Sequence, residues 1–206
     1  ARDPDFELGS AAAERVRALA PARPRPAVPV EDARARVVED PAVGRLRVDT
    51  ARADPGDLTV CADGTDAVEV VQSLWVGSLF AAKDASFLEH RRISHVVSVL
   101  PEPPRLPAGT ASQHVNVADT HETLIGAHFD AALDFIADAR GSGGTVLVHC
   151  WRGISRASTI VSAALMRHEG MGAAQALAHV QARRACADPN PAFRTQLRIF
   201  ERLGCA

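Results

Sequence analysis

The hydrophobic pattern of the chain changes near residue 65. From about Val68 to the C-terminus, short apolar runs alternate with segments whose apolar residues recur at helical spacing. Short runs that are apolar at nearly every position are typical of strands covered on both faces, and their alternation with helices favours parallel pairing. The pattern therefore predicts an α/β fold with a central, mostly parallel sheet flanked by helices. The expected strands are Val68–Val71, Leu74–Val76, His95–Leu100, Gln113–Val117 and Thr145–Val148.

Helices are expected between and after these strands. The first runs from His128 to about Arg140 and carries one broad apolar stripe. The second, Ala157–His168, is apolar on most sides, which predicts a buried helix. The third spans Ala173–Arg184. The last has Asn190 as its cap and Pro191 at its first position.

Residues 1–65 differ from this pattern and predict an N-terminal extension ahead of a globular domain at 66–206. The stretch at 21–26 is rich in Pro, Ala and Arg, a composition that buries little apolar surface. We expect a poorly structured segment that is either a plain linker or a regulatory or partner-binding element. Only residues 39–41 and 46–48 favour local strand.

The composition and net charge of the chain argue against nucleic acid and membrane partners. A net charge of -2 and a pI near 6.5 provide no field that would attract nucleic acid or an anionic membrane surface. No apolar run approaches the roughly 18–20 residues that span a bilayer, and no N-terminal signal is visible. We expect neither nucleic acid nor a membrane span. The polar opening at residues 1–10 lacks Met and suggests a fragment or an engineered addition, so it is left out of fold prediction.

The cysteines Cys61, Cys150, Cys186 and Cys205 lie far apart and form no Cys-x-x-Cys pair. That spacing favours neither a zinc site nor a disulfide framework, and it indicates a reducing, intracellular setting in the cytoplasm or nucleus. We expect Cys61, Cys186 and Cys205 to be passive thiols. The histidines show no spacing suited to a metal, so neither a metal nor another cofactor is expected.

The candidate chemistry lies after the strand Thr145–Val148. A loop between a buried strand and a helix N-terminus points its N–H groups into one concavity that suits an oxyanion. Gly153 allows close approach of the backbone, and Arg156 offers two parallel donors to phosphate oxygens. The positive surroundings favour the thiolate of Cys150, which can then attack phosphorus. The loop reads His149, Cys150, Trp151, Arg152, Gly153, Ile154, Ser155, Arg156.

This segment resembles the signature His-Cys-x-x-Gly-x-x-Arg of cysteine-based protein phosphatases, specifically the dual-specificity class. The resemblance extends to Leu74–Ser78, to Ile93–Val99, and to Asn190–Phe193 with Gln196–Leu197. It covers about residues 68 to 206. It implies metal-free hydrolysis of a phosphorylated protein in two steps, through a cysteinyl-phosphate.

The resemblance also assigns roles to residues. Cys150 is the expected nucleophile, and Arg156 with the loop amides is expected to bind phosphate. Asp119, after the fourth expected strand, matches the general acid and later base, although a turn or cap aspartate would occupy the same place. His149 is expected to orient the loop and tune the thiolate. Ser155 either forms a hydrogen bond within the loop or is a polar filler.

One departure from the family pattern concerns turnover. The family usually has Ser or Thr directly after the loop arginine, where its hydroxyl helps the sulfur leave, and this chain has Ala157. Ser158 and Thr159 follow on the helix but face other directions. We expect a burst of product followed by slow turnover, and a phosphate-binding pseudophosphatase remains an alternative.

A second group of features bears on the substrate. Arg152 either contacts a second anionic group or lies on the surface, which keeps a soluble inositol phosphate open as substrate. The short segment between Leu74 and His149 leaves no room for an added recognition loop. A shallow site that admits phosphoserine and phosphothreonine as well as phosphotyrosine is therefore expected. The sequence predicts no oligomeric state.

Overall fold

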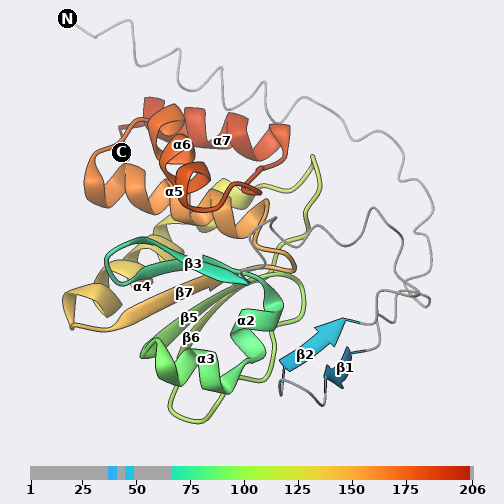
Figure 1. The fold of residues 1–206 in the computed structure, drawn as a ribbon. Coiled ribbons are helices and arrows are strands. Elements are labelled where there is room, and N and C mark those ends of the chain that lie inside the picture. The colour runs from blue at the N-terminus through green and yellow to red at the C-terminus, as the bar shows by residue number, and fades with distance from the viewer. Residues whose placement is uncertain (1–36, 41–44, 49–65, 205–206) are drawn as a thin grey trace, which may run out of the picture. The chain divides into compact units, whose positions relative to one another are not determined.

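The computed structural model describes residues 37–40, 45–48 and 66–204 (Figure 1). The chain divides into two units, Ala1–Pro55 and Gly56–Ala206. In the first unit, β1 (Val37–Asp40) pairs antiparallel with β2 (Arg45–Val48). These strands lie where the sequence favours local strand. The rest of the predicted N-terminal extension lies outside the described residues, and its boundary stays a prediction.

The second unit is built on a five-stranded sheet with the order β3-β4-β7-β5-β6 (Figure 1). Only the edge strand β3 runs antiparallel to its neighbour, and the other pairs are parallel. The predicted central, mostly parallel sheet is confirmed, with strand bounds that shift by at most two residues. The strands are β3 (Ala67–Val71), β4 (Leu74–Gly77), β5 (Ile93–Val99), β6 (Ala111–Val115) and β7 (Thr145–His149).

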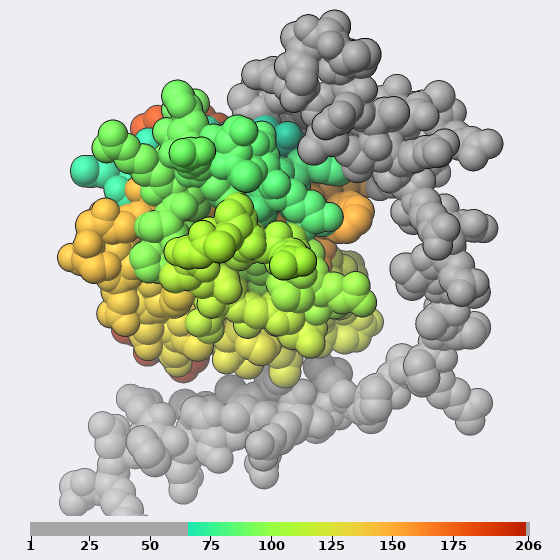
Figure 2. Space-filling model, turned by 90° about the horizontal axis from the view of Figure 1, so that it is seen from below, coloured from blue at the N-terminus to red at the C-terminus, as the bar shows by residue number. Residues whose placement is uncertain are grey.

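Helices cover both faces of this sheet, with α4 to α7 on one side and α2 and α3 on the other (Figure 1). Figure 2 looks onto the second side, where the green surface of α2 and α3 lies beside the yellow-green segment that connects β5 and β6. None of the helices within the described residues is long and apolar enough to cross a membrane. They are α2 (Leu79–Lys83), α3 (Ala85–His90), η2 (Ile125–His128), α4 (Phe129–Gly141), α5 (Arg156–Glu169), α6 (Ala173–Arg183) and α7 (Pro191–Arg202).

The two covered faces explain why the central strands are apolar at nearly every position. Side chains alternate between the faces of a strand. In β4, Leu74 and Val76 join the larger core under α4 to α7, whereas Trp75 joins the smaller core with α2 and α3. In β7, Val148 lies in the larger core and Leu147 in the smaller one. Hydrophobic burial on both sides therefore holds these strands in the middle of the domain.

The short helices α2 and α3 are absent from the sequence prediction. Their capping signals are nevertheless present, because Ser78 accepts hydrogen bonds from the first turn of α2 and Asp84 accepts one from Phe87 N in α3. Such short helices show too few turns for an apolar period to be recognised. Packing of Leu88 in the smaller core accompanies the cap.

The parallel arrangement places several chain segments at one edge of the sheet. Strands β4, β5, β6 and β7 run in the same direction, so their carboxyl ends meet there. The loop after β7, the end of β4 at Gly77 and the segment after β6 that carries Asp119 all lie at this edge. Ligand sites of α/β sheets form at such an edge. The buried helix α5 begins at Arg156, directly after the loop at this edge.

Candidate active site

The loop between β7 and α5 is held from outside through its carbonyl groups. Because each loop carbonyl from residue 151 to residue 155 accepts a hydrogen bond from a group outside this segment, the amide N–H groups are left to line the inner side. The bonds are Leu79 N to Trp151 O (3.1 Å), Arg184 to Arg152 O and to Gly153 O (2.9 Å each), Asp188 N to Ile154 O (2.9 Å), and Thr159 N to Ser155 O (2.9 Å).

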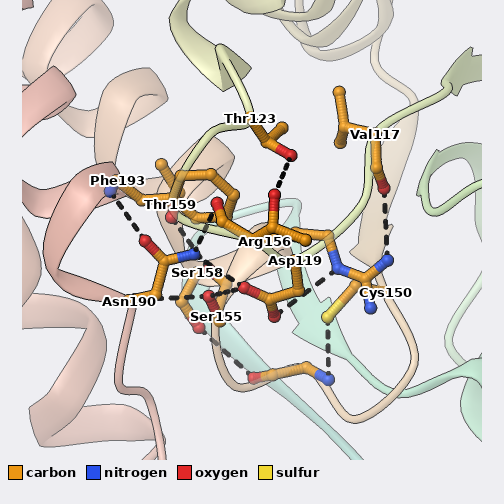
Figure 3. Close-up of polar contacts among 12 residues, drawn as sticks. Val117, Asp119, Thr123, Cys150, Ser155, Arg156, Ser158, Thr159, Asn190 and Phe193 are labelled. Carbon is orange, nitrogen blue, oxygen red and sulfur yellow. Dashed lines mark hydrogen bonds and ion pairs between the residues drawn. The ribbon is translucent and has the colours of Figure 1, made fainter. Parts of the chain in front are cut away.

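Cys150 lies on the inner side of this loop and is only 2% exposed. Its Sγ accepts a hydrogen bond from Gly153 N at 3.2 Å (Figure 3). Gly153 adopts a φ of 70°, in the left-handed region. A Cβ at this position would lie 2.4 Å from the carbonyl oxygen of Gly77. Only glycine therefore fits where the loop passes the end of β4.

Arg156 begins α5 and reaches across to the segment after β6. Its Nη1 donates to Val117 O at 3.3 Å, and its Nε lies 3.6 Å from Asp119 Oδ2 (Figure 3). The side chain is 11% exposed. Its buried Nε is without a hydrogen-bond partner among the described residues. The guanidinium thus retains donor capacity that an oxyanion bound in the site would use.

Asp119 is joined to the loop by hydrogen bonds to its Oδ1. Ser155 Oγ and Asn190 Nδ2 each donate to this oxygen at 2.8 Å (Figure 3). The Asp119 side chain is 32% exposed, so the carboxyl group lies at the rim of the site. The sequence leaves two roles open for Ser155, and the structure shows that its hydroxyl connects the Cys150 loop to Asp119.

His149 is fully buried behind the loop. Its Nδ1 lies 3.2 Å from Cys150 O, and its Nε2 lies 2.8 Å from Ser98 Oγ. Since a carbonyl oxygen only accepts, Nδ1 carries the proton and the Ser98 hydroxyl donates to Nε2. The pKa of His149 is lowered to about 4, mainly by burial; the hydrogen bond to the Cys150 carbonyl opposes this shift and the charge of Arg156 adds to it. The ring is therefore neutral near pH 7.

Arg184 is a site residue that the sequence interpretation does not single out. It is 2% exposed, and it donates from Nε to Gly153 O and from Nη2 to Arg152 O. A buried guanidinium is tolerated when its donors are used, as these are. In the sequence it is only the last residue of the helix predicted at Ala173–Arg184, and that position gives no signal of this contact.

The sequence prediction of passive thiols is wrong for Cys186, which is disulfide-bonded. Spacing along the chain does not reveal which thiols meet in space. Cys150 is free, and Cys61 and Cys205 lie outside the described residues. Within the part of the chain that is described, no group of three His, Cys, Asp or Glu side chains could hold a metal ion. The intracellular, reducing setting stays a prediction.

Fold and site together define an α/β domain with a buried cysteine in the loop between a central strand and a helix N-terminus, the arrangement of cysteine-based phosphatases. A family model described as "Dual specificity phosphatase, catalytic domain" matches residues 74–203. The chain belongs to this family, as the resemblance of its loop implies.

Known proteins of the family agree with this assignment. Dual specificity protein phosphatase 1B of Arabidopsis thaliana is 41% identical over 68% of this chain and 84% of its own length. Dual specificity protein phosphatase 15 of Mus musculus is 38% identical over 66% of this chain and 58% of its own length. The crystal structure of human DUSP28 superposes with a TM-score of 0.67 at 32% identity, covering 69% of this chain and 97% of that chain.

Alanine variants of Gly153 and Gly143 separate two costs of adding a Cβ: the close contact with Gly77 O, which only Gly153 has, and the left-handed φ, which both residues have. Gly143 also has a left-handed φ, of 81°, but nothing lies within 4 Å of a Cβ there. We expect Gly143→Ala to lower the free energy of unfolding by about 1 kcal/mol and Gly153→Ala to lower it by at least about 2 kcal/mol. Urea denaturation and titration with inorganic phosphate measure both effects.

Phosphate binding should be retained by Gly143→Ala and lost by Gly153→Ala. Equal losses of stability in the two variants, with phosphate binding intact in both, would contradict the close contact with Gly77 O.

Burial of neutral His149 should make stability depend on pH. Between its folded pKa of about 4 and the ordinary 6.5, the unfolded chain binds a proton that the folded chain does not. The stabilising contribution is therefore complete above about pH 6.5 and is lost as the pH falls toward 4. Between pH 7 and pH 5, we expect the free energy of unfolding to fall by about 2 kcal/mol more in the unmodified protein than in His149→Asn.

Urea denaturation at both pH values measures this difference. His168→Asn is the comparison variant: burial lowers the pKa of His168 as well, but this ring lies outside the site, so the part of the fall that comes from His149 should remain in it. An equal fall in the unmodified protein and in His149→Asn would show that the ring does not titrate in this way.

Proposed function

We propose that this chain is a protein phosphatase that hydrolyses phosphotyrosine, phosphoserine and phosphothreonine through a cysteinyl-phosphate intermediate. One observation carries the proposal. Cys150 Sγ lies inside the loop 3.2 Å from Gly153 N, and Arg156 at the end of the same loop keeps its guanidinium near the segment of Asp119. The N–H donor that reaches the sulfur and the guanidinium of Arg156 suit the oxygens of a phosphoryl group. The names of the related proteins support a phosphoprotein as substrate.

In the first step, Cys150 Sγ attacks phosphorus and forms the S–P bond while the bond to the ester oxygen breaks. The leaving oxygen takes the proton of the Asp119 carboxyl group. The position of Asp119 supports this role, because it lies at the rim and contacts the nucleophile's loop through Ser155. Arg156 and the loop amides stabilise the charge on the three remaining phosphoryl oxygens.

In the second step, a water molecule attacks the phosphorus of the cysteinyl-phosphate. The Asp119 carboxylate, left unprotonated by the first step, takes the proton of this water. The S–P bond breaks, its electron pair returns to Sγ, and phosphate is released. Neutral His149 takes no part in proton transfer. Its Nδ1–H donates to the Cys150 carbonyl and so fixes the orientation of that peptide group.

Ala157 affects the second step, in which sulfur is the leaving group. It is fully buried at the start of α5 and brings no hydroxyl toward Cys150. The next hydroxyls are used elsewhere, since Ser158 donates to Gly153 O at 3.2 Å and Thr159 donates to Ser155 O at 2.9 Å. The departing thiolate thus has one donor fewer than the family pattern supplies. Breakdown of the intermediate is the slow step.

The reaction is tested on phosphotyrosine and phosphothreonine peptides with variants of the acid and the nucleophile. Cys150→Ser should lower the turnover of both peptides by roughly 10³-fold or more, because a hydroxyl is not ionised in this loop. Asp119→Asn should lower it by roughly 10²-fold, because the amide has no proton to transfer. Asp134→Asn, which alters an exposed ion pair with Arg167, should leave turnover unchanged.

Undiminished hydrolysis by Cys150→Ser would refute the mechanism. Release of phosphate from an inositol phosphate well above release from both peptides would instead identify a different substrate class for the same chemistry.

Replacing Ala157 by serine should speed the second step. We expect the unmodified protein to give a burst of alcohol product followed by slow turnover. Ala157→Ser should lose the burst and turn over about tenfold faster, as expected for one restored hydrogen bond to a charged sulfur. Rapid-quench kinetics measure both phases. Ala163→Ser, also buried in α5, adds a hydroxyl away from the site as a control.

Unchanged turnover by Ala157→Ser would exclude this explanation. A complete absence of turnover by the unmodified protein, with phosphopeptide binding retained, would favour a phosphate-binding pseudophosphatase.

A further inference from the structure

We propose that two side-chain amides of α7, Asn190 at its N-cap and Gln196 in its middle, are positioning residues that hold the Asp119 segment (residues 119–126) over the Cys150 loop. The inference rests on the proposed function, in which Asp119 transfers the proton. Neither residue touches the reacting atoms, and both act through the segment that they hold.

Asn190 connects three parts of the structure (Figure 3). Its Oδ1 accepts a hydrogen bond from Phe193 N at 3.0 Å and caps α7, while its Nδ2 donates to Asp119 Oδ1 at 2.8 Å. Its backbone N donates to Ser155 Oγ at 3.1 Å, and this hydroxyl donates in turn to Asp119 Oδ1. Asn190 therefore joins the start of α7, the Cys150 loop and Asp119.

The cap alone does not require asparagine. Asp, Ser and Thr cap helices about as well, because each supplies an oxygen for the free N–H groups of the first turn. Only the amide supplies this oxygen and also an N–H donor aimed at the Asp119 carboxylate. The contact with Asp119 is thus the part of the arrangement that depends on Asn190 being asparagine.

Gln196 holds the far end of the same segment. Its Oε1 accepts from Gly126 N and its Nε2 donates to Thr123 O, both at 2.8 Å. One side chain thereby satisfies a backbone donor and a backbone acceptor of a segment that has no sheet partner. Helix α7 can serve as a rigid base, because Phe193 and Leu197 are buried in the larger core.

The two amides hold the segment at both ends, so the carboxyl group of Asp119 is confined to the rim above Cys150. A general acid must lie within hydrogen-bond reach of the leaving oxygen, and its effect is greatest when that oxygen is a poor leaving group. Loss of either amide should therefore harm poor leaving groups selectively. A purely structural role in the fold would lower all rates equally.

The test uses the full chain and two aryl phosphates, phenyl phosphate with a poor leaving group and 4-nitrophenyl phosphate with a good one. Asn190→Ser and Asn190→Asp keep an oxygen for the cap but remove the N–H donor, and Gln196→Met removes both hydrogen bonds at similar size. We expect each variant to lower kcat/KM for phenyl phosphate by about tenfold or more, and for 4-nitrophenyl phosphate by less than about threefold. Thr195→Ala, exposed on the same helix, should change neither rate.

A double variant separates positioning from general damage. In an Asp119→Asn background, Asn190→Ser should have no further effect on phenyl phosphate, because the group that it positions is gone. The alkylation rate of Cys150 by iodoacetate should match that of the unmodified protein in every variant.

Three outcomes would overturn the positioning role: an equal loss for both substrates, an effect that persists in the Asp119→Asn background, and unchanged rates in all three amide variants. Failure of the proposed function is distinguishable, since the unmodified protein would then hydrolyse neither aryl phosphate, or Cys150→Ser would retain full activity.

Discussion

The structure depends on the hydrogen bonds that hold the carbonyl groups of the loop after β7 from outside. Every carbonyl from residue 151 to residue 155 is engaged in this way, and Gly153 N, on the inner side of the loop, donates to Cys150 Sγ. Arg184 supplies two of these bonds from a nearly fully buried position. Burying its charge is costly, and using its donors on loop carbonyls offsets that cost. The conformation of the Cys150 loop therefore depends on the packing that buries Arg184.

Cys150 Sγ meets a backbone N–H donor inside the loop, whereas the Asp119 carboxyl group lies at the rim of the site. Arg156 reaches from the start of α5 to the segment after β6, where it contacts Val117 O and Asp119. His149 adds no competing charge, because burial keeps its ring neutral. Asn190, at the start of helix α7, connects Asp119 to the Cys150 loop through hydrogen bonds to Asp119 and Ser155. A site assembled from three separate segments in this way keeps its geometry only while all three remain packed on the sheet.

Local patterns predicted most of the fold because burial on both faces leaves a direct mark on sequence. The apolar runs of β4 and β7 indicated central strands, since each feeds two cores. Helices α2 and α3 left no such mark, because elements of this length show no period. Asn190 was predicted as a cap from its place before Pro191, and that contact is present. Its hydrogen bond to Asp119 was not predictable, because it depends on where another segment lies.

The sequence by itself determined the strand, the loop and the helix that follows it. Cys150, Gly153 and Arg156 lie within one short segment, so local backbone geometry and residue chemistry suffice to indicate an anion site. Only the tertiary structure decided which distant groups complete it. Asp119, Arg184 and Asn190 come from three other parts of the chain, and their contacts depend on how β6, α6 and α7 are packed in the fold. Such contacts between distant segments leave no periodic signal in sequence, because each needs only one polar side chain in the right place.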